Sequence, residues 1–162
     1  MIGKLSVILL AFIMLVPPSQ CIGGQSTSTA PATQHVEQGD AFFTQGLYDE
    51  AVKEYTAAIE LEPTLAVAYW GRGKVYHFDK GEYSKAAEDY SKAIELDPKY
   101  TKAYYYRGLA NAANGVYDRA IADFSKTIEL EPSLITAYNL RAWCYTQGTM
   151  GSIIATFPVP VI

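Results

Sequence analysis

The 162-residue sequence has little of what a disulfide framework, a metal centre or a nucleic-acid interface needs. Its two cysteines, Cys21 and Cys144, are too few and too unevenly placed for a disulfide-bonded scaffold. Its two isolated histidines, His35 and His77, form no metal-ligand cluster. The formal net charge is -4 and the pI is near 5.1, so the basic surface that nucleic-acid binding requires is missing.

Catalytic motifs are missing as well. The sequence contains no Ser/His/acid order, no CxxC pair, no HExxH and no Gly-rich phosphate loop. The nearest approach to a phosphate loop, Gly71 to Lys74, follows no predicted strand and precedes Val75 instead of Ser or Thr. Acidic pairs such as Glu60 and Glu62 recur at predicted helix ends, which is typical of solvated residues. We therefore expect no enzymatic activity, no metal and no cofactor.

The amino-terminal residues have a different composition from the rest. Lys4 precedes the 12 residues Leu5 to Val16, which are apolar except for Ser6 and are followed by two prolines. A basic start and a short apolar stretch predict a signal segment or membrane anchor over residues 1–23. A transmembrane helix would need about 20 apolar residues. Residues 24–33, rich in Ser, Thr, Gly and Gln, predict a flexible linker.

Cys21 lies just past this apolar stretch, where bacterial lipoproteins carry their lipid-modified cysteine. Gln20 stands where such proteins normally have a small residue. Lipidation of Cys21, cleavage after Cys21 or Gly23, and an uncleaved anchor therefore all stay open. Each predicts an exported protein that is membrane-anchored, periplasmic or secreted.

Three segments of the chain nearly superimpose. They cover residues 48–63, 83–98 and 117–132, and each ends in Glu-Leu-acid-Pro. The closing prolines, Pro63, Pro98 and Pro132, lie 35 and 34 residues apart. This period and these residues resemble the tetratricopeptide repeat (TPR) family over residues 35–147. Several positions recur together, so the resemblance is specific.

The recurring positions have physical roles. Gly46, Gly81 and Gly115 fall between helical patterns, where a chain reversal favours positive φ. The next helix of each pair is expected to start at an N-cap residue: Asp49, Ser84 or Asp118. Small Ala and large aromatic residues then trace one apolar face at helical spacing: Ala51, Tyr55 and Ala58, then Ala86, Tyr90 and Ala93, then Ala120, Phe124 and Thr127. The second repeat has one extra turn residue around His77 to Lys80.

These patterns predict an all-α fold over residues 34–148. The resemblance implies a right-handed α-solenoid of antiparallel helix pairs, with three full repeats and the first helix of a fourth, near Ser133 to Gln147. After Gly148 the repeat stops, and Pro158 and Pro160 exclude a helix through the end. Residues 149–162 are therefore expected to form an apolar irregular tail. Such a tail is either functional or the product of a truncated gene.

In TPR proteins the first helix of each pair lines the concave face. Carried over to this sequence, the resemblance implies a partner-binding groove lined by Phe43, Trp70, Lys74, Lys102, Tyr105, Tyr106, Leu109 and Asn139, with further groove positions at Val36, Asp40, Val67, Gly71, Leu140 and Trp143. Large amphipathic residues such as Trp70, Tyr105 and Tyr106 often dominate interface energetics. The alternative is that this aromatic stripe belongs to the core.

One kind of TPR groove holds a partner's carboxylates with lysine and asparagine. The corresponding positions here are Val36, Asp40, Gly71, Lys102 and Tyr106, of which Lys102 alone matches. We therefore expect a scaffold of the cell envelope that binds a protein or peptide with apolar anchors. It would bind no nucleic acid and would touch the membrane only through its amino-terminal segment. The alternative is a structural protein that self-assembles through the fourth-repeat helix.

Overall fold

The computed structural model describes residues 30–156, with side chains described as far as residue 148. These residues form seven α-helices and no strand, which confirms the all-α prediction. The helices are α1 (Pro31–Thr44), α2 (Tyr48–Leu61), α3 (Ala66–Phe78), α4 (Tyr83–Leu96), α5 (Thr101–Ala113), α6 (Tyr117–Leu130) and α7 (Ile135–Thr156).

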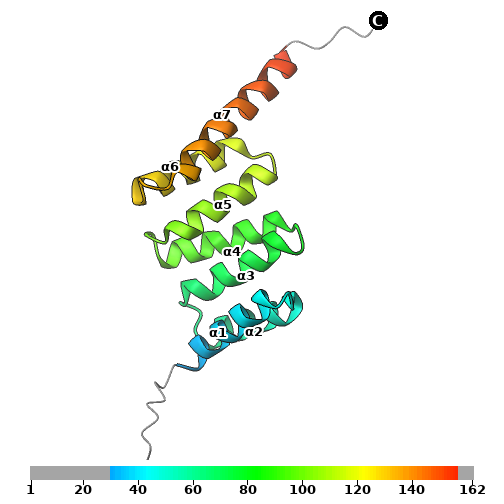
Figure 1. Ribbon diagram of the computed structural model, residues 1–162, viewed down its shortest axis with the longest axis vertical. Helices are drawn as coiled ribbons and strands as arrows, with labels where there is room; N and C mark the ends of the chain where they lie inside the picture. Colours follow the sequence, from blue (N-terminus) through cyan, green and yellow to red (C-terminus); the bar gives the residue numbers. More distant parts are fainter. Residues whose placement is uncertain (1–29, 157–162) are drawn as a thin grey trace, which may run out of the picture.

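The helices stack as an extended series of pairs (Figure 1). The closest partners are α1 with α2, α3 with α4, and α5 with α6. Each pair also packs on the next, through α2 with α3, α4 with α5, and α6 with α7. The first helices of consecutive pairs touch as well, α1 against α3 and α3 against α5. Each unit thus buries its apolar face on its neighbours, as in a solenoid.

The turn within each pair is built on a glycine with positive φ, as predicted. Gly46, Gly81 and Gly115 have φ of 75°, 60° and 75°. In the first turn the Leu47 amide donates to Phe42 O at 2.9 Å, and in the third the Val116 amide donates to Asn111 O at 2.8 Å. These are the long hydrogen bonds of a Schellman helix end. The extra residue of the second repeat lengthens only the turn between Phe78 and Tyr83.

The predicted N-caps of the second helices are wrong by two residues. The caps are Leu47, Glu82 and Val116, with no side-chain cap hydrogen bond, and the helices begin at the tyrosine that follows each. The reason is that the residue that closes the turn also opens the next helix: the Leu47 carbonyl accepts from the Ala51 amide at 3.0 Å. Asp49 and Asp118 therefore lie in the first helical turn, where a negative charge interacts favourably with the helix dipole.

The core repeats one contact, an aromatic ring of the second helix against a glycine of the first. Tyr55, Tyr90 and Phe124 are fully buried. A Cβ placed on Gly73 would lie 2.9 Å from Tyr90 Cε1, and one on Gly108 would lie 2.8 Å from Phe124 Cε1. Such distances are shorter than carbon atoms can approach without a shift of the ring or backbone. The glycines therefore let the two helices of a pair close around the ring.

Helix α7 is longer than expected. It was predicted to end near Gln147, with an irregular stretch from residue 149, yet it continues to Thr156. Unlike the turn glycines, Gly148 does not have a positive φ, and a glycine inside a helix costs only about 1 kcal/mol relative to alanine. The first proline beyond the helix is Pro158, and proline disfavours helix in the residue before it. The remainder of the predicted tail, residues 157–162, lies outside the described residues.

The other end of the array also begins earlier than predicted. Helix α1 starts at Pro31, inside the predicted linker, because proline is well suited to the first turn of a helix. The predicted signal segment, Cys21 and the linker up to residue 29 lie outside the described residues. Among the helices that the structure does describe, none has both the length and the apolarity to cross a membrane.

The aromatic-on-glycine contact predicts opposite effects of the same substitution at two helical glycines. Gly108→Ala should destabilise the protein by about 1–3 kcal/mol, because the added methyl group overpacks the Phe124 ring. The control is Gly148→Ala, where the nearest atom, Tyr117 Cβ, lies 3.8 Å from the new Cβ. It should be neutral or stabilise by up to about 1 kcal/mol, since alanine favours helix. Urea unfolding midpoints measure both, and equal shifts would contradict the packing argument.

Candidate functional site

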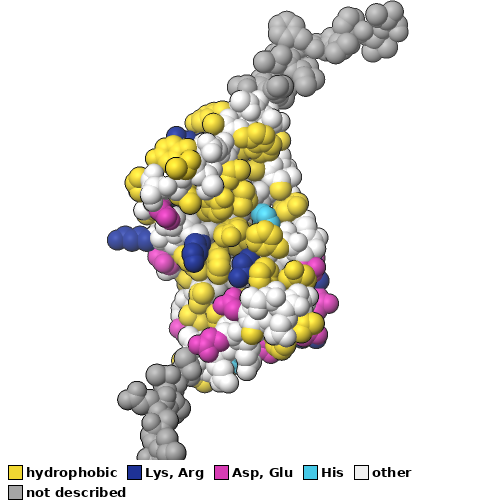
Figure 2. All heavy atoms as spheres, viewed as in Figure 1, with side chains coloured by type: hydrophobic (Ala, Val, Ile, Leu, Met, Phe, Trp, Pro, Cys, Tyr) yellow, Lys and Arg dark blue, Asp and Glu magenta, His cyan; other side chains and the backbone are white. Residues whose placement is uncertain are grey.

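Four of the predicted groove residues line one pocket. Trp70 comes from α3, and Lys102, Tyr105 and Tyr106 come from α5. Thr101, Glu131, Leu134 and Thr136 complete a cavity of about 390 Å³. The face of the array drawn in Figure 2 carries a band of hydrophobic side chains with Lys and Arg side chains among them. Such a mixture of aromatic walls and a few polar groups is typical of ligand-binding concavities.

Lys74 connects this pocket to the first repeat. Its ammonium lies 4.3 Å from the centre of the Phe43 ring and 4.6 Å from the centre of the Trp70 ring. It also lies 3.4 Å from Asp40 Oδ1, and the Lys74 side chain is only 15% exposed. The ammonium of Lys74 therefore already interacts with two aromatic rings and one carboxylate of the protein. Lys102 differs, because its ammonium lies 5.5 Å from the Trp70 ring centre while the residue is exposed.

Tyr106 joins the pocket to the core. Its ring centre lies 6.0 Å from that of Trp70, which lines the pocket, and 6.0 Å from that of the fully buried Tyr90. Tyr105 packs edge-on against Tyr106 at 5.4 Å and against the buried Phe124 at 6.0 Å. Burial raises the pKa of Tyr106 above its ordinary value, so its hydroxyl stays protonated at neutral pH. The pocket wall is thus a continuation of the aromatic core and is held rigidly.

The other predicted groove residues lie elsewhere. Phe43 packs on Tyr48 and Phe78, and Leu109 packs on the cluster around Phe124. Asn139 is exposed on α7 and does not line the pocket. Four of the further groove positions belong to the core or pack against it: Val36, Val67, Gly71 and Leu140. Trp143 packs edge-on against Tyr117. Asp40 accepts hydrogen bonds from Tyr55 and Lys74. Of the predicted groove residues, the pocket therefore contains Trp70, Lys102, Tyr105 and Tyr106.

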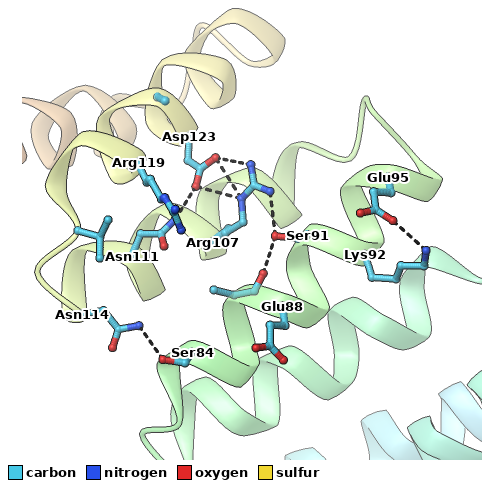
Figure 3. Close-up of a pocket in the computed structure, with 13 residues that line it drawn as sticks. Ser84, Glu88, Ser91, Lys92, Glu95, Arg107, Asn111, Asn114, Arg119 and Asp123 are labelled. Carbon is cyan, nitrogen blue, oxygen red and sulfur yellow. Dashed lines mark hydrogen bonds and ion pairs between the residues drawn. The ribbon is translucent and has the colours of Figure 1, made fainter.

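A second cavity, of about 720 Å³, lies among α4, α5 and α6 (Figure 3). Its polar groups are largely bonded to one another. Arg107 Nη2 donates to Asp123 Oδ1 at 2.7 Å, and Asn111 Nδ2 donates to Asp123 Oδ2 at 3.0 Å. Lys92 pairs with Glu95 at 2.8 Å on the rim. The arrangement stabilises the packing of the three helices, and we assign it no ligand.

Arg107 belongs to a column of arginines that the sequence analysis missed. Arg72 Nη2 donates to Asp89 at 2.8 Å and its Nη1 donates to Thr56 at 3.3 Å, so that it ties α3 to both α4 and α2. Arg107 makes the same contacts one repeat later, with Asp123 and with Ser91 at 3.0 Å. The signal was available in the sequence. Arginines recur at positions 72, 107 and 141, with an aspartate 17 or 16 residues after the first two.

Comparisons with known proteins agree with this geometry. The family described as "TPR repeat" matches residues 39–78 and 77–115, and that described as "Tetratricopeptide repeat" matches residues 102–133. Together these matches cover more than half of the chain. The chain belongs to the tetratricopeptide repeat family. The TPR is a protein-interaction repeat fold. No curated protein matches the sequence.

Solved TPR structures resemble the array closely. The first TPR of Spaghetti (RPAP3), bound to the HSP90 peptide SRMEEVD, is 33% identical with a TM-score of 0.69, over 72% of this chain and 91% of that one. The second TPR domain of human RPAP3, in complex with the HSP70 peptide SGPTIEEVD, is 30% identical with a TM-score of 0.67, over 71% and 95%. The Sgt2 TPR domain from Aspergillus fumigatus is 26% identical with a TM-score of 0.72, over 83% and 89%.

Half of the pocket lining was not anticipated. Glu131 and Leu134 come from the turn between repeats, and Thr101 and Thr136 come from the first turns of α5 and α7. A signal existed for Leu134, because an apolar residue follows each closing proline by two positions, as Leu65, Tyr100 and Leu134. Tyr100 takes part in the same arrangement one repeat earlier, with its ring centre 5.9 Å from that of Trp70.

The part of the chain that the structure describes contains no group of three or more His, Cys, Asp or Glu side chains able to hold a metal ion. The one histidine near the pocket, His77, packs against Phe78, Tyr83 and Tyr106. Its Nδ1 is buried and has no hydrogen-bond partner among the described residues. Burial therefore lowers the pKa of His77 below its ordinary value.

The lowered pKa of His77 predicts an acid-sensitive array. The unfolded chain takes up a proton near pH 6.5, whereas the folded chain does so only at lower pH, so the stabilisation is present above pH 6.5 and is lost as pH falls through the folded pKa. The free energy of unfolding, measured by urea titration between about pH 7.5 and pH 5.5, should fall on acidification. His77→Phe should remove most of that loss. A wild-type curve that is flat over this range would refute the argument.

Proposed function

We propose that this protein is a non-catalytic interaction scaffold that binds a peptide segment of another protein in the pocket of Trp70, Lys102, Tyr105 and Tyr106. The observation that carries the proposal is the position of these rings. They line a cavity, and the contacts with glycine at the centre of each helix pair are made by other rings, those of Tyr55, Tyr90 and Phe124. Rigid aromatic residues beside a lysine are the kind of group that anchors a peptide.

The chemistry of the pocket favours a segment with an apolar or aromatic anchor. Trp70, Tyr105, Tyr106 and Leu134 offer apolar surface, and Lys102 offers one cation that is not held in an ion pair by the described residues. Glu131 on the rim adds a negative charge beside it. An anchor side chain with a nearby backbone carbonyl or a single acidic group would match these partners, in the manner of other groove-bound peptides.

The chaperone peptides of the similar structures fit this pocket less well. SRMEEVD and SGPTIEEVD, bound by two of the RPAP3 domains, end in acidic residues and a free carboxylate. Here Lys74, whose ammonium lies 4.6 Å from the Trp70 ring centre, pairs with Asp40, which also accepts a hydrogen bond from the Tyr55 hydroxyl at 2.6 Å. Lys74 is thus already neutralised, and one lysine, Lys102, remains to meet three or more negative charges. We expect these peptides to bind weakly or not at all.

The groove assignment predicts which tryptophan matters for binding. Peptides enriched from a random library on the full chain should carry an aromatic or large apolar anchor. Trp70→Ala should weaken the best of them by more than about 2 kcal/mol, some thirtyfold in Kd, because it removes a wall of the pocket. Trp143→Ala is the matched control, since Trp143 lies on α7 beside Tyr117 and outside the pocket. Isothermal titration measures both variants.

Three results would contradict the assignment. The first is equal weakening by both tryptophan substitutions, and the second is no weakening by Trp70→Ala plus Tyr105→Ala. The third is tight binding of SRMEEVD that survives Lys102→Ala, since the peptide carboxylates would then use another surface. Circular dichroism of each variant separates a lost contact from a lost fold.

The cellular setting that we propose is the cell envelope. It rests on the amino-terminal sequence alone: Lys4, the apolar stretch from Leu5 to Val16 and the cysteine at position 21. Mass spectrometry of the mature amino terminus distinguishes a lipid on Cys21, cleavage nearby and an uncleaved anchor. Recovery of the intact, unmodified chain in the cytoplasmic fraction would sink the envelope assignment.

Self-assembly is the alternative function, and one observation favours it. Large apolar side chains remain exposed on the last described helix, with Ile135 71% and Trp143 46% exposed. Stacking of arrays through α7 would give a molecular mass that rises with protein concentration and returns to the monomer value in Trp143→Glu.

A further inference from the structure

Helix α7 exposes a face that its counterpart in the third repeat, α5, buries or partly buries. The face consists of Ile135, Tyr138, Arg141 and Ala142, one and two helical turns apart. Ile135 is 71% exposed, Tyr138 is 40% exposed, and Ala142 is exposed too. The equivalent residues of α5, 34 positions earlier, are Thr101, Tyr104, Arg107 and Gly108, all of them buried or partly buried. We call these four residues of α7 the outer face.

The helix that covers this surface in the complete repeats has a fixed chemistry. In α4 the covering residues are Ala86, Asp89, Tyr90 and Ala93, and in α6 they are Ala120, Asp123, Phe124 and Thr127, all buried. The pattern is a small residue, an acid three positions later, a large apolar residue next to the acid, and a small residue three positions further. The acid meets the arginine of the first helix and the large residue rests on its glycine.

Arg141 is the arginine of the column for which no acid is in place. Its Nη1 donates to Ser125 in α6 at 3.2 Å, just as Arg72 donates to Thr56 and Arg107 to Ser91. The column would place its carboxylate partner 34 residues after Asp123, where the sequence has Phe157. No ion pair of Arg141 exists within the described residues. Among the described residues the guanidinium thus keeps the hydroxyl half of its usual contacts and has no carboxylate partner.

We propose that the outer face binds an amphipathic helix of a partner protein. That helix carries an acidic residue directly followed by leucine, a small residue three positions before the acid and another three positions after the leucine. The acid pairs with Arg141 and the small residues allow close approach, as in α4 and α6. Leucine is specified instead of an aromatic residue because α7 has Ala142 where α5 has Gly108. A Cβ at Gly108 would lie 2.8 Å from Phe124 Cε1, and leucine lacks the outer ring atoms that would collide.

A second copy of the chain does not offer such a helix. The three helices with the acid-plus-aromatic pattern, α2, α4 and α6, already bury its aromatic residue within their own pairs, and in α2 the acid, Glu54, pairs with His35 of α1. The end helix α1 is the first helix of its pair and lacks the pattern, because neither of its acids precedes a large apolar residue. Its Asp40 is followed by Ala41 and accepts a hydrogen bond from Tyr55. The carboxylate that pairs with Arg141 is therefore expected to come from a different protein.

The test uses the chain's own covering helix as the probe. A fluorescent peptide with the sequence of residues 117–130, in which Phe124 is replaced by leucine, is titrated with the full-length protein. Arg141→Ala should lower its affinity about tenfold or more, because a charged hydrogen-bonded pair is lost. A peptide that also carries Asp123→Asn should bind the wild-type protein about tenfold more weakly than the first peptide does. The two peptides should bind Arg141→Ala with nearly equal affinity, as expected when the two exchanged groups interact with each other. Arg119→Ala, an exposed arginine on α6, is the control and should bind normally.

The design also distinguishes docking on α7 from exchange with α6. A peptide that displaced α6 would rest on Gly108 and prefer phenylalanine, whereas docking on Ala142 prefers leucine. Ala142→Phe, a substitution at an exposed position, should block the peptide without unfolding the array. Preference for the phenylalanine peptide, unchanged affinity for Arg141→Ala, or no binding to the wild type would each overturn the proposal. So would a molecular mass that rises with concentration and falls back in Tyr138→Glu, since the occupant would then be a second copy.

Discussion

The fit of one aromatic ring onto one glycine is the contact on which the rest of the array depends. It occurs three times, with Tyr55, Tyr90 and Phe124 fully buried against Gly39, Gly73 and Gly108. Because the ring fills the space that a side chain on the first helix would take, the two helices of a pair come close enough to bury small residues such as Ala51, Ala86 and Ala120 between them.

The arginines at positions 72 and 107 add polar contacts that also link neighbouring helix pairs. Arg72 and Arg107 each reach a carboxylate on their own second helix and a hydroxyl on the preceding one. Both aspartates are nearly buried, at 7% and 4% exposed, and a buried carboxylate without its cation would be costly. The apolar contact and the ion pairs therefore both act within a pair, while the hydrogen bonds from the arginines to Thr56 and Ser91 link each pair to the preceding one. Arg141 donates to Ser125 of α6 in the same way at the end of the described array.

Most of the fold could be predicted from the sequence because the same residue types recur at the same positions in three repeats. Glycine turns, closing prolines, buried aromatics and the longer second turn were all visible as positions that recur at 34 or 35 residues. What the sequence analysis missed depends on contacts that periodicity does not encode. The N-caps were misplaced because the backbone of the Schellman turn, and not a side chain, opens the next helix. The end of α7 was misplaced because Gly148 takes part in a helix when no chain reversal follows. Of the residues that line the pocket, Trp70, Lys102, Tyr105 and Tyr106 are among the predicted groove positions. Glu131 lies in the turn after α6 and Thr136 in the first turn of α7, and neither is a groove position of the repeat.

The same division between packing and surface distinguishes the two binding surfaces that we propose. Residues that hold the array together recur, and residues that do not recur are free to differ between repeats. Trp70 corresponds to Tyr105 and Asn139, and Lys74 corresponds to Leu109 and Trp143. The pocket therefore has a composition that belongs to no other place in the array. The outer face of α7 is the opposite case, because there the recurring positions themselves are left uncovered. The partner that we propose for the pocket would have to match residues that occur once in the array, whereas the partner that we propose for the outer face would repeat the residue pattern by which α4 and α6 cover α3 and α5.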